Sequence, residues 1–328
     1  MQRGINHSDA LAAPVRDLVR SICGSVCCSN STYQRIQLKM KHLFFLLLLV
    51  PVTVSAQRDW SRMQVSTTEI ADNIYRLFVD PGVATVLFTG PDGALLIDAA
   101  YQQTTPQLLL SIDSLTQQSV KYLINTHHHA DHTGGNAAFG AEATIIAHKF
   151  VRDFVSNNQT QGSRQIAALP WEAWPEVTFT DKLYLDFNGQ TIEILHLPGG
   201  HTGGDAIVFF PESKVLVLGD LLFADNFPFV DVANGGNPRR FLDHLHWVAG
   251  NFPEGASIIG GHGPVYSMAQ FRWYVSQLEK TIETVLQAKK NGMSLEEAKS
   301  NRILKEWESW GRFFITEDRW IETIYQSL

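Results

Sequence analysis

The residues best suited to chemistry lie in one short segment of the chain, Thr126-His127-His128-His129-Ala130-Asp131-His132. Three imidazoles and a carboxylate in the pattern His-x-His-x-Asp-His stabilise a fold poorly, because each must be desolvated or left exposed on a turn. Neutral imidazole nitrogens and carboxylate oxygens are, however, the ligands that Zn²⁺ prefers, with iron and manganese as substitutes. The segment therefore predicts a metal site, although histidine runs also occur as exposed turns that bind metal adventitiously.

The sequence around this motif places its ligands on a loop at the end of a strand. Residues 120–125 (VKYLIN) are apolar and β-branched, which is typical of a buried strand. Small residues follow the motif at 133–136 (TGGN), and they allow the backbone to turn tightly against the site.

Three later segments each offer one further ligand where a predicted strand ends. They are His201 in 198–205 (PGGHTGGD), Asp220 in 218–220 (LGD) and His262 in 260–264 (GGHGP). Glycines on both sides of the two histidines permit the turns that bring imidazoles inward from separate loops. Each residue alone is more typical of a cap or a turn, but together with the motif they complete a ligand set.

Turn residues and apolar spacing divide the rest of the chain into short strands and longer helices. Strands are expected at 74–79, 83–89, 94–98, 120–125, 144–147, 182–187, 191–197, 206–210, 214–218 and 257–260. Helices are expected at 104–118, 148–155, 239–249, 271–290 and 295–305, and a loop over the site is expected at 159–175. Two strand-rich halves with outer helices predict an α+β fold, a four-layer αββα sandwich.

The N-terminal region carries a secretory signal pattern that does not begin at residue 1. Lys39, Met40 and Lys41 precede an apolar run at 43–50, and 54–56 (VSA) fits a cleavage site before Gln57. The run is too short to form a stable membrane anchor. We therefore expect residues 1–39 to be a spurious or dispensable leader, 40–56 to be the signal peptide, and 57–328 to be a single domain that is periplasmic or secreted.

Cysteine content and net charge exclude two classes of function, thiol chemistry and nucleic-acid binding. All three cysteines, Cys23, Cys27 and Cys28, lie upstream of the expected cleavage site, so the exported chain has no disulfide or thiolate chemistry. Residues 57–328 carry 20 Lys and Arg and 31 Asp and Glu, which gives a net charge of −11. A chain this acidic is not expected to bind nucleic acid by charge.

Together these motifs resemble the metallo-β-lactamase-fold superfamily of metal-dependent hydrolases, and the resemblance covers residues 70–265. It implies the αββα sandwich of that family and seven metal ligands shared between two ions. By this resemblance the terminal ligands are His127, His129 and His201 on the first metal and Asp131, His132 and His262 on the second. Asp220 bridges the two metals, whereas Asp98, at the end of a predicted strand, supports the site and is not a ligand.

The remaining histidines are expected to be peripheral. His128 lies between two ligands and should point away from them. For His128, His148 and His196 we expect supporting or surface roles. His244 and His246 are two residues apart on a predicted helix, so they do not share a face and are assigned no role.

The resemblance implies a dinuclear zinc enzyme with a metal-bridging hydroxide as its nucleophile. Two zinc ions about 3.5–4 Å apart lower the pKa of a shared water towards roughly 7. The hydroxide is expected to attack a carbonyl, and Asp131 is expected to orient it or to shuttle its proton. Position 220 is Asp, whereas some β-lactamases place cysteine in the second site, so the chain is more similar here to lactonases and glyoxalase II.

We therefore expect an exported hydrolase that cleaves an ester, lactone, thioester or amide in a small molecule, β-lactams included. Residues 223–229 (FADNFPF), Trp171 and Trp174 are candidates for the wall of a partly apolar pocket. Two alternatives share the ligand set: an iron-dependent oxidoreductase on the same fold, and a non-catalytic metal-binding envelope protein. The intact set of seven ligands favours an enzyme over the second alternative.

Overall fold

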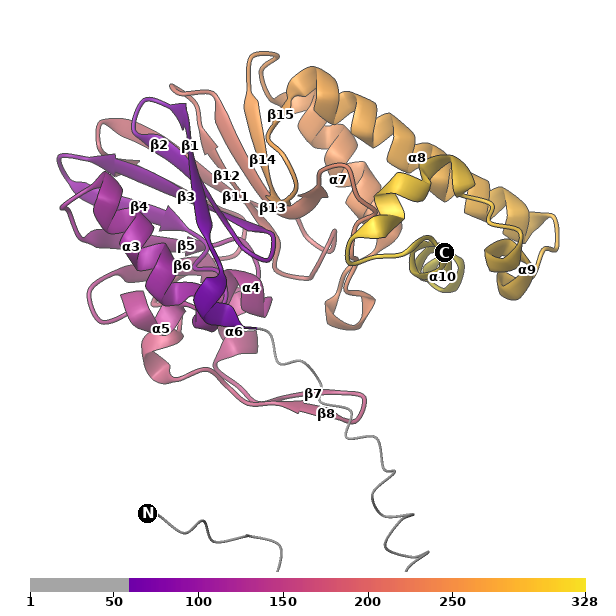
Figure 1. The fold of residues 1–328 in the computed structure, drawn as a ribbon, viewed down its shortest axis with the longest axis horizontal. Helices are drawn as coiled ribbons and strands as arrows, with labels where there is room; N and C mark the ends of the chain where they lie inside the picture. Colours follow the sequence, from indigo (N-terminus) through magenta and orange to yellow (C-terminus); the bar gives the residue numbers. More distant parts are fainter. Residues whose placement is uncertain (1–58) are drawn as a thin grey trace, which may run out of the picture. The chain divides into compact units, whose positions relative to one another are not determined.

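The computed structural model describes residues 59–328, and Figure 1 shows two β-sheets between two groups of helices. The first sheet has seven strands in the order β1-β2-β3-β4-β5-β6-β9. Their bounds are β1 (Val65–Ala71), β2 (Ile74–Val79), β3 (Val83–Gly90), β4 (Gly93–Ile97), β5 (Val120–Asn125), β6 (Thr144–His148) and β9 (Val177–Phe179). Strands β1 to β4 pair antiparallel, and β4, β5, β6 and β9 pair parallel.

The second sheet has six strands in the order β10-β11-β12-β13-β14-β15. Their bounds are β10 (Lys182–Phe187), β11 (Gln190–His196), β12 (Ala206–Phe210), β13 (Val215–Phe223), β14 (Ser257–His262) and β15 (Tyr266–Ser267). Only the β13–β14 pair is parallel. A parallel pair needs a crossover, and helix α7 (Pro238–Asn251) provides it here.

The central strands are apolar on both faces, because each sheet is covered on both sides. Val86 and Phe88 of β3 belong to the buried cluster between the two sheets, whereas Leu87 between them belongs to the outer cluster under helix α3 (Thr105–Leu115). In β12, Val208 joins the cluster between the sheets and Ile207 joins the cluster under the helices on the other side. This alternation with period two produces the four expected layers.

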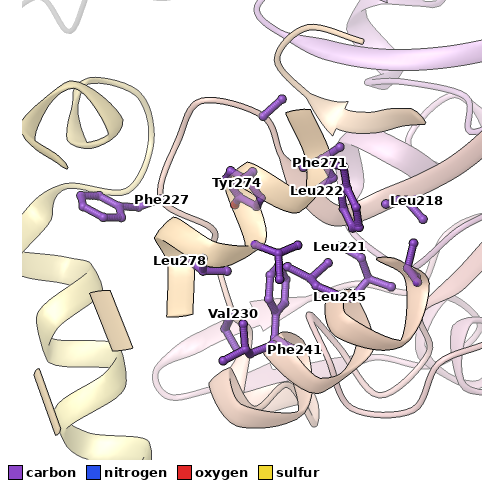
Figure 2. Packing of buried hydrophobic residues seen from close by; sticks show 14 of the residues in the cluster. Leu218, Leu221, Leu222, Phe227, Val230, Phe241, Leu245, Phe271, Tyr274 and Leu278 are labelled. Atoms are coloured by element: carbon purple, nitrogen blue, oxygen red, sulfur yellow. The ribbon is translucent and has the colours of Figure 1, made fainter. Parts of the chain in front are cut away.

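The outer layer on the second sheet is built from α7, α8 (Met268–Lys290) and α10 (Glu317–Ser327). Figure 2 shows Phe241 and Leu245 of α7 and Phe271 and Tyr274 of α8 in one buried cluster with Leu222 of β13. Burying each such side chain stabilises the fold by about 1.5–3 kcal/mol. The cluster therefore fixes β13, which carries one of the candidate ligands, against the helices.

Several helix ends differ from the predicted ones because of local capping. Helix α3 ends at Leu115, since Thr116 is extended. Helix α8 begins earlier than expected, at Met268, because Ser267 and Gln270 form a capping box. Helix α9 (Leu295–Ser300) stops before the predicted end at 305, and a 3₁₀ helix follows at Lys305–Arg312. The other two predicted helices, α6 (Lys149–Val155) and α7, lie within two residues of their predicted bounds.

Other elements were not predicted. Strand β1, the short strands β9 and β15, and the C-terminal helix α10 have no counterpart in the predicted set. The expected loop at 159–175 contains a hairpin, β7 (Gln159–Gln161) and β8 (Arg164–Ile166), and a 3₁₀ turn at Trp171–Ala173. The proposed leader and signal peptide lie outside the described residues, and no helix within residues 59–328 is long and apolar enough to cross a membrane.

Helix α10 is held by a buried carboxylate at its first residue. Glu317 is 8% exposed, accepts a hydrogen bond from the Leu304 backbone N–H at 3.1 Å and pairs with Arg302 at 3.0 Å. Arg302 also pairs with Glu308 at 3.3 Å, but that glutamate is half exposed. The two glutamates therefore differ in burial while sharing one partner.

We expect Glu317→Ala to lower the free energy of unfolding by about 1–3 kcal/mol, because it leaves a buried backbone N–H without an acceptor. The matched control Glu308→Ala, which removes an exposed partner of the same arginine, should change it by no more than about 1 kcal/mol. Urea denaturation of both variants measures the difference. Equal effects would show that the buried hydrogen bond does not stabilise α10.

Candidate metal centre

The candidate ligands meet where strands of both sheets end. His127 and His129 follow β5, and the short helix α4 (Ala130–Thr133) carries the next two ligands of the motif. The other three ligands come from the second sheet: His201 from the β11–β12 loop, Asp220 from β13 and His262 from the last position of β14. Contrary to the prediction, Asp220 does not follow its strand, because β13 continues to Phe223.

A register shift in β13 places Asp220 at the centre. The β13–β14 ladder is irregular around Gly219, which has a left-handed φ of 52°. A Cβ atom at Gly219 would lie 2.6 Å from Thr126 Oγ1, so only glycine allows this close approach to the loop of the histidine motif. Gly261 of β14 also allows a close approach, in this case by the Asp220 side chain, since a Cβ there would lie 2.0 Å from Asp220 Oδ1.

The first group of ligands consists of three imidazoles and one carboxylate oxygen. His129 Nδ1 lies 3.0 Å from His127 Nε2 and 2.9 Å from His201 Nε2. Asp220 Oδ2 lies 3.7 Å from His127 Nε2 and 3.5 Å from His201 Nε2. All four ligand atoms lie within 4.8 Å of one another, so they converge on one point.

The second group uses the other oxygen of the same carboxylate. Asp220 Oδ1 lies 3.1 Å from His132 Nε2 and 3.4 Å from His262 Nε2. Asp131 Oδ2 lies 3.7 Å from His132 Nε2 and 3.5 Å from His262 Nε2. The structure therefore brings the seven predicted residues into two groups of four that share Asp220.

Each of these imidazoles contacts an oxygen through the ring nitrogen that faces away from the centre. His132 Nδ1 lies 2.7 Å from Asp98 Oδ2, which also accepts a hydrogen bond from the Thr126 hydroxyl at 2.7 Å. That hydroxyl lies 3.1 Å from His127 Nδ1. Asp98 therefore supports two of the histidines without joining either group, in the position expected of it.

The remaining three imidazoles also contact an oxygen through the ring nitrogen that faces away from the centre. His201 Nδ1 lies 2.7 Å from the Phe229 carbonyl, and His262 Nδ1 lies 2.6 Å from the Gly82 carbonyl. His129 is turned the other way round: its Nε2 lies 2.9 Å from Asp231 Oδ2, and its Nδ1 faces the centre. In a neutral imidazole, an outer acceptor of this kind keeps the proton on the outer nitrogen and leaves the inner nitrogen free to bind a metal ion.

Burial and charge set the protonation of these groups. Burial lowers the pKa of His127 well below its usual value and that of His201 to about 4, so both imidazoles are neutral at pH 7. Burial also opposes protonation of His132 and His262, but the nearby Asp220 carboxylate raises the pKa of both, that of His262 to about 10. Burial would raise the pKa of Asp220, but the neighbouring His262 and His132 hold it well below its usual value.

The residues fit divalent metal ions. Among residues 59–328, His132 Nε2 and Asp220 Oδ1 are buried polar atoms without a hydrogen-bond partner, although they lie 3.1 Å apart. Leaving such atoms unsatisfied is costly in a protein interior, whereas a cation between them would satisfy both. Imidazole nitrogens and carboxylate oxygens are also the donor set that zinc, iron and manganese prefer.

Two supporting residues near the site were not predicted. Asp231 accepts hydrogen bonds from Asn234 Nδ2 at 2.6 Å and orients His129, but its local sequence carries no metal-binding signal. Asp205 closes the loop of His201 by accepting its backbone N–H at 2.7 Å and the Thr202 hydroxyl at 2.5 Å. Burial raises the pKa of Asp205 to about 7, even though these hydrogen bonds favour the carboxylate. Its place at the end of a glycine-rich turn was the available signal.

His128, which we expected to be peripheral, joins neither group of four but is not a surface residue. Its side chain is 1% exposed, its ring lies 3.8 Å from that of Phe154, and its Nε2 lies 3.8 Å from Asp231 Oδ2. Among the described residues neither of its ring nitrogens has a hydrogen-bond partner. Burial lowers the pKa of His128 well below its usual value, so the ring is neutral at pH 7.

The other histidines lie away from the ligand groups. His148 and His196 stack on each other with ring centroids 3.7 Å apart and so join β6 of one sheet to β11 of the other. His244 Nε2 lies 3.0 Å from the Pro198 carbonyl, and His246 pairs with exposed Glu279 at 3.5 Å. None of these four belongs to a group of candidate ligands.

A cavity of about 530 Å³ adjoins the first group, with His129 in its wall. Of the predicted residues 223–229, Phe229 lines this cavity, and the other six are not among its lining residues. Trp171 and Trp174 do not line it: Trp171 is 70% exposed, and the Trp174 indole donates to the Leu169 carbonyl at 2.8 Å. The loop that carries them contributes Leu169 instead.

Comparison with known proteins identifies the family. The family model of the metallo-beta-lactamase superfamily matches residues 78–266. The chain is 24% identical over 235 residues to metallo-beta-lactamase type 2 of Bacteroides fragilis, covering 68% of this chain and 90% of that protein. It is 29% identical over 157 residues to hydroxyacylglutathione hydrolase of Synechococcus sp. (strain JA-3-3Ab), covering 47% of this chain and 51% of that protein.

Solved structures agree on the fold. A metallo-beta-lactamase from Pontibacter korlensis superimposes with a TM-score of 0.55 at 22% identity, over 66% of this chain and 99% of that one. The inverting sec-alkylsulfatase Pisa1 from Pseudomonas sp. gives a TM-score of 0.60 at 13% identity, over 80% of this chain and 50% of that one. These likenesses confirm the predicted αββα sandwich. Since the matched segment covers more than half of the chain and contains all seven candidate ligands, the chain belongs to the metallo-beta-lactamase superfamily of metal-dependent hydrolases.

Proposed function

We propose that the protein is a dinuclear zinc hydrolase that cleaves an ester, lactone, thioester or amide in a small molecule. The observation that carries this proposal is the shared Asp220 carboxylate, whose two oxygens face two separate groups of ligand atoms. His127, His129 and His201 would hold one ion, and Asp131, His132 and His262 the other, with Asp220 between them. Two such ions supply a Lewis acid for a carbonyl oxygen and activate water for attack.

Asp131 is the group best placed to hold a proton during hydrolysis. Its side chain is 16% exposed, compared with 4% for Asp220, so it faces the solvent side of the centre. Burial alone would raise the pKa of Asp131, but His132 and His262 outweigh this effect and lower it. The carboxylate is therefore ionised at pH 7 and able to accept a proton from water and return it to a leaving group.

Two features favour hydrolysis over the alternatives. Relatives named metallo-beta-lactamase and hydroxyacylglutathione hydrolase support hydrolytic chemistry on a small molecule. The complete ligand set, with an oriented outer acceptor for every histidine, argues against a protein that only retains the fold. The names of these relatives imply different substrates, so we propose the class of bond that is cleaved, an acyl bond in a small molecule.

Metal analysis of the purified protein should find close to two zinc ions per chain, because seven ligands exceed what one tetrahedral ion requires. Prolonged dialysis against a chelator should abolish hydrolysis of a nitrocefin, lactone and thioester panel and lower the melting temperature, since metal binding stabilises the folded state. Zinc should restore both. One iron and no zinc per chain, with no hydrolysis of the panel, would favour an oxidoreductase instead.

Gly261 offers a test of the shared carboxylate that does not replace any of the seven ligand residues. We expect Gly261→Ala to weaken metal affinity by about 10- to 100-fold, because the added methyl group displaces Asp220 Oδ1. Gly250→Ala is the matched control, since a Cβ there meets nothing within 4 Å. Competition with a chromogenic zinc chelator measures both. Unchanged affinity in Gly261→Ala would contradict the bridging role of Asp220.

We also propose that the protein is exported, on the basis of the signal pattern at 40–56 alone. Expression from Met40 in a Gram-negative bacterial host should yield a periplasmic product that begins at Gln57, because small residues at 54–56 suit signal peptidase. N-terminal sequencing of the periplasmic fraction decides this. A product retained in the cytoplasm with residues 40–56 intact would contradict export.

A further inference from the structure

The cavity beside the first ligand group has a predominantly apolar wall. Phe154, Ile166, Leu169 and Phe229 contribute to it, and its volume of about 530 Å³ suits a small organic ligand. Ile166 belongs to the β7–β8 hairpin, which the sequence did not predict. Since His129 also lines the cavity, an apolar group bound there lies next to the metal centre.

The C-terminal segment that precedes and begins α10 forms another part of this wall. Phe314 lines the cavity, and its ring centroid lies 5.7 Å from that of Phe229. The neighbouring Phe313 ring lies 5.8 Å from that of the candidate ligand His262. This segment follows residues 78–266, the part of the chain that the family model matches.

Arg319, in the first turn of α10, is the one arginine or lysine among the described residues of the cavity wall. Its guanidinium carbon lies 5.6 Å from the Phe229 ring centroid and 5.8 Å from that of Phe314. Within residues 59–328, no carboxylate pairs with it, whereas Arg302 nearby in sequence pairs with two glutamates. The aromatic faces hold the guanidinium at the cavity and leave its N–H donors available.

A second feature of the wall also indicates a ligand. His128 is buried, and both of its ring nitrogens lack a partner among the described residues. Unsatisfied buried polar groups are rare in native proteins, and a ligand in the cavity would give this imidazole a partner. Asp231 also lines the cavity, but its carboxylate is held by His129. The cavity therefore has a largely apolar wall, the positively charged Arg319 guanidinium, and an imidazole without a hydrogen-bond partner among the described residues.

We propose that the substrate is an apolar acyl compound that carries a carboxylate away from the scissile bond, and that Arg319 binds this carboxylate. The proposal rests on the hydrolase function proposed above, and it makes Arg319 a specificity-determining residue. A guanidinium forms two parallel hydrogen bonds with a carboxylate, a geometry that a neutral ester cannot match. The apolar acyl chain occupies the wall formed by the aromatic side chains, and the metal centre faces the bond to be cleaved.

Matched substrates of the zinc-loaded protein test this specificity. Mono-4-nitrophenyl glutarate and 4-nitrophenyl pentanoate have acyl chains of the same length and differ in a terminal carboxylate. We expect kcat/KM for the anionic ester to fall by about tenfold in Arg319→Gln, mainly through KM, and that for the neutral ester to change little. Arg312→Gln is the matched control, because it removes an exposed arginine from the same segment without altering the cavity wall.

A binding measurement separates this inference from the proposed function. Calorimetric titration with 4-phenylbutyrate and its neutral analogue 4-phenylbutanol should show about tenfold preference for the anion, which Arg319→Gln abolishes and Arg312→Gln retains. A preference that survives in Arg319→Gln would place the carboxylate on the metal ions and overturn the inference. If the preference depends on Arg319 but neither ester is hydrolysed, the anion site stands and the hydrolase proposal fails.

Discussion

The arrangement of the candidate metal centre depends on one buried carboxylate, that of Asp220. Asp220 is 4% exposed and lies within 3.7 Å of four imidazole nitrogens. Removing an ionised carboxylate from water costs several kcal/mol unless opposite charge and hydrogen bonds compensate. Most of the local structure serves this compensation: glycines at 219 and 261 make room for the side chain, and acceptors from loops of both sheets fix the surrounding histidines. The site therefore forms only when the two sheets pack against each other and bury Asp220.

The sequence was informative where local chemistry determines the structure. The histidine motif follows a strand, and glycines surround His201 and His262, so the ligand positions and the two strand-rich halves were predictable from residue types and spacing. The expected helices outside the two strand-rich halves also predicted the layers, because each sheet must be covered on both faces. The seven ligand candidates come together as the motif order implied.

Features that depend on distant contacts were not predictable. Asp231 orients His129 from 102 residues away, and nothing in its neighbours distinguishes it from an ordinary loop aspartate. Helix α10 depends on Glu317, whose partners lie in a preceding turn, so its stability is not visible in local spacing. The surroundings of His128 were not predictable either. The alternating motif indicates which histidines point to the metal, but not that His128 packs against Phe154.

The loop at residues 229–234 connects two parts of the site. Phe229 lines the cavity with its ring and accepts from His201 with its carbonyl, and Asp231 orients His129. A ligand that shifts this loop on entering the cavity must also change the orientation of two imidazoles. By thermodynamic linkage the effect is reciprocal: a compound that binds more tightly to the metal-loaded protein raises metal affinity by the same factor. Where divalent metal is scarce, such a compound would thus raise the fraction of the protein that is loaded with metal.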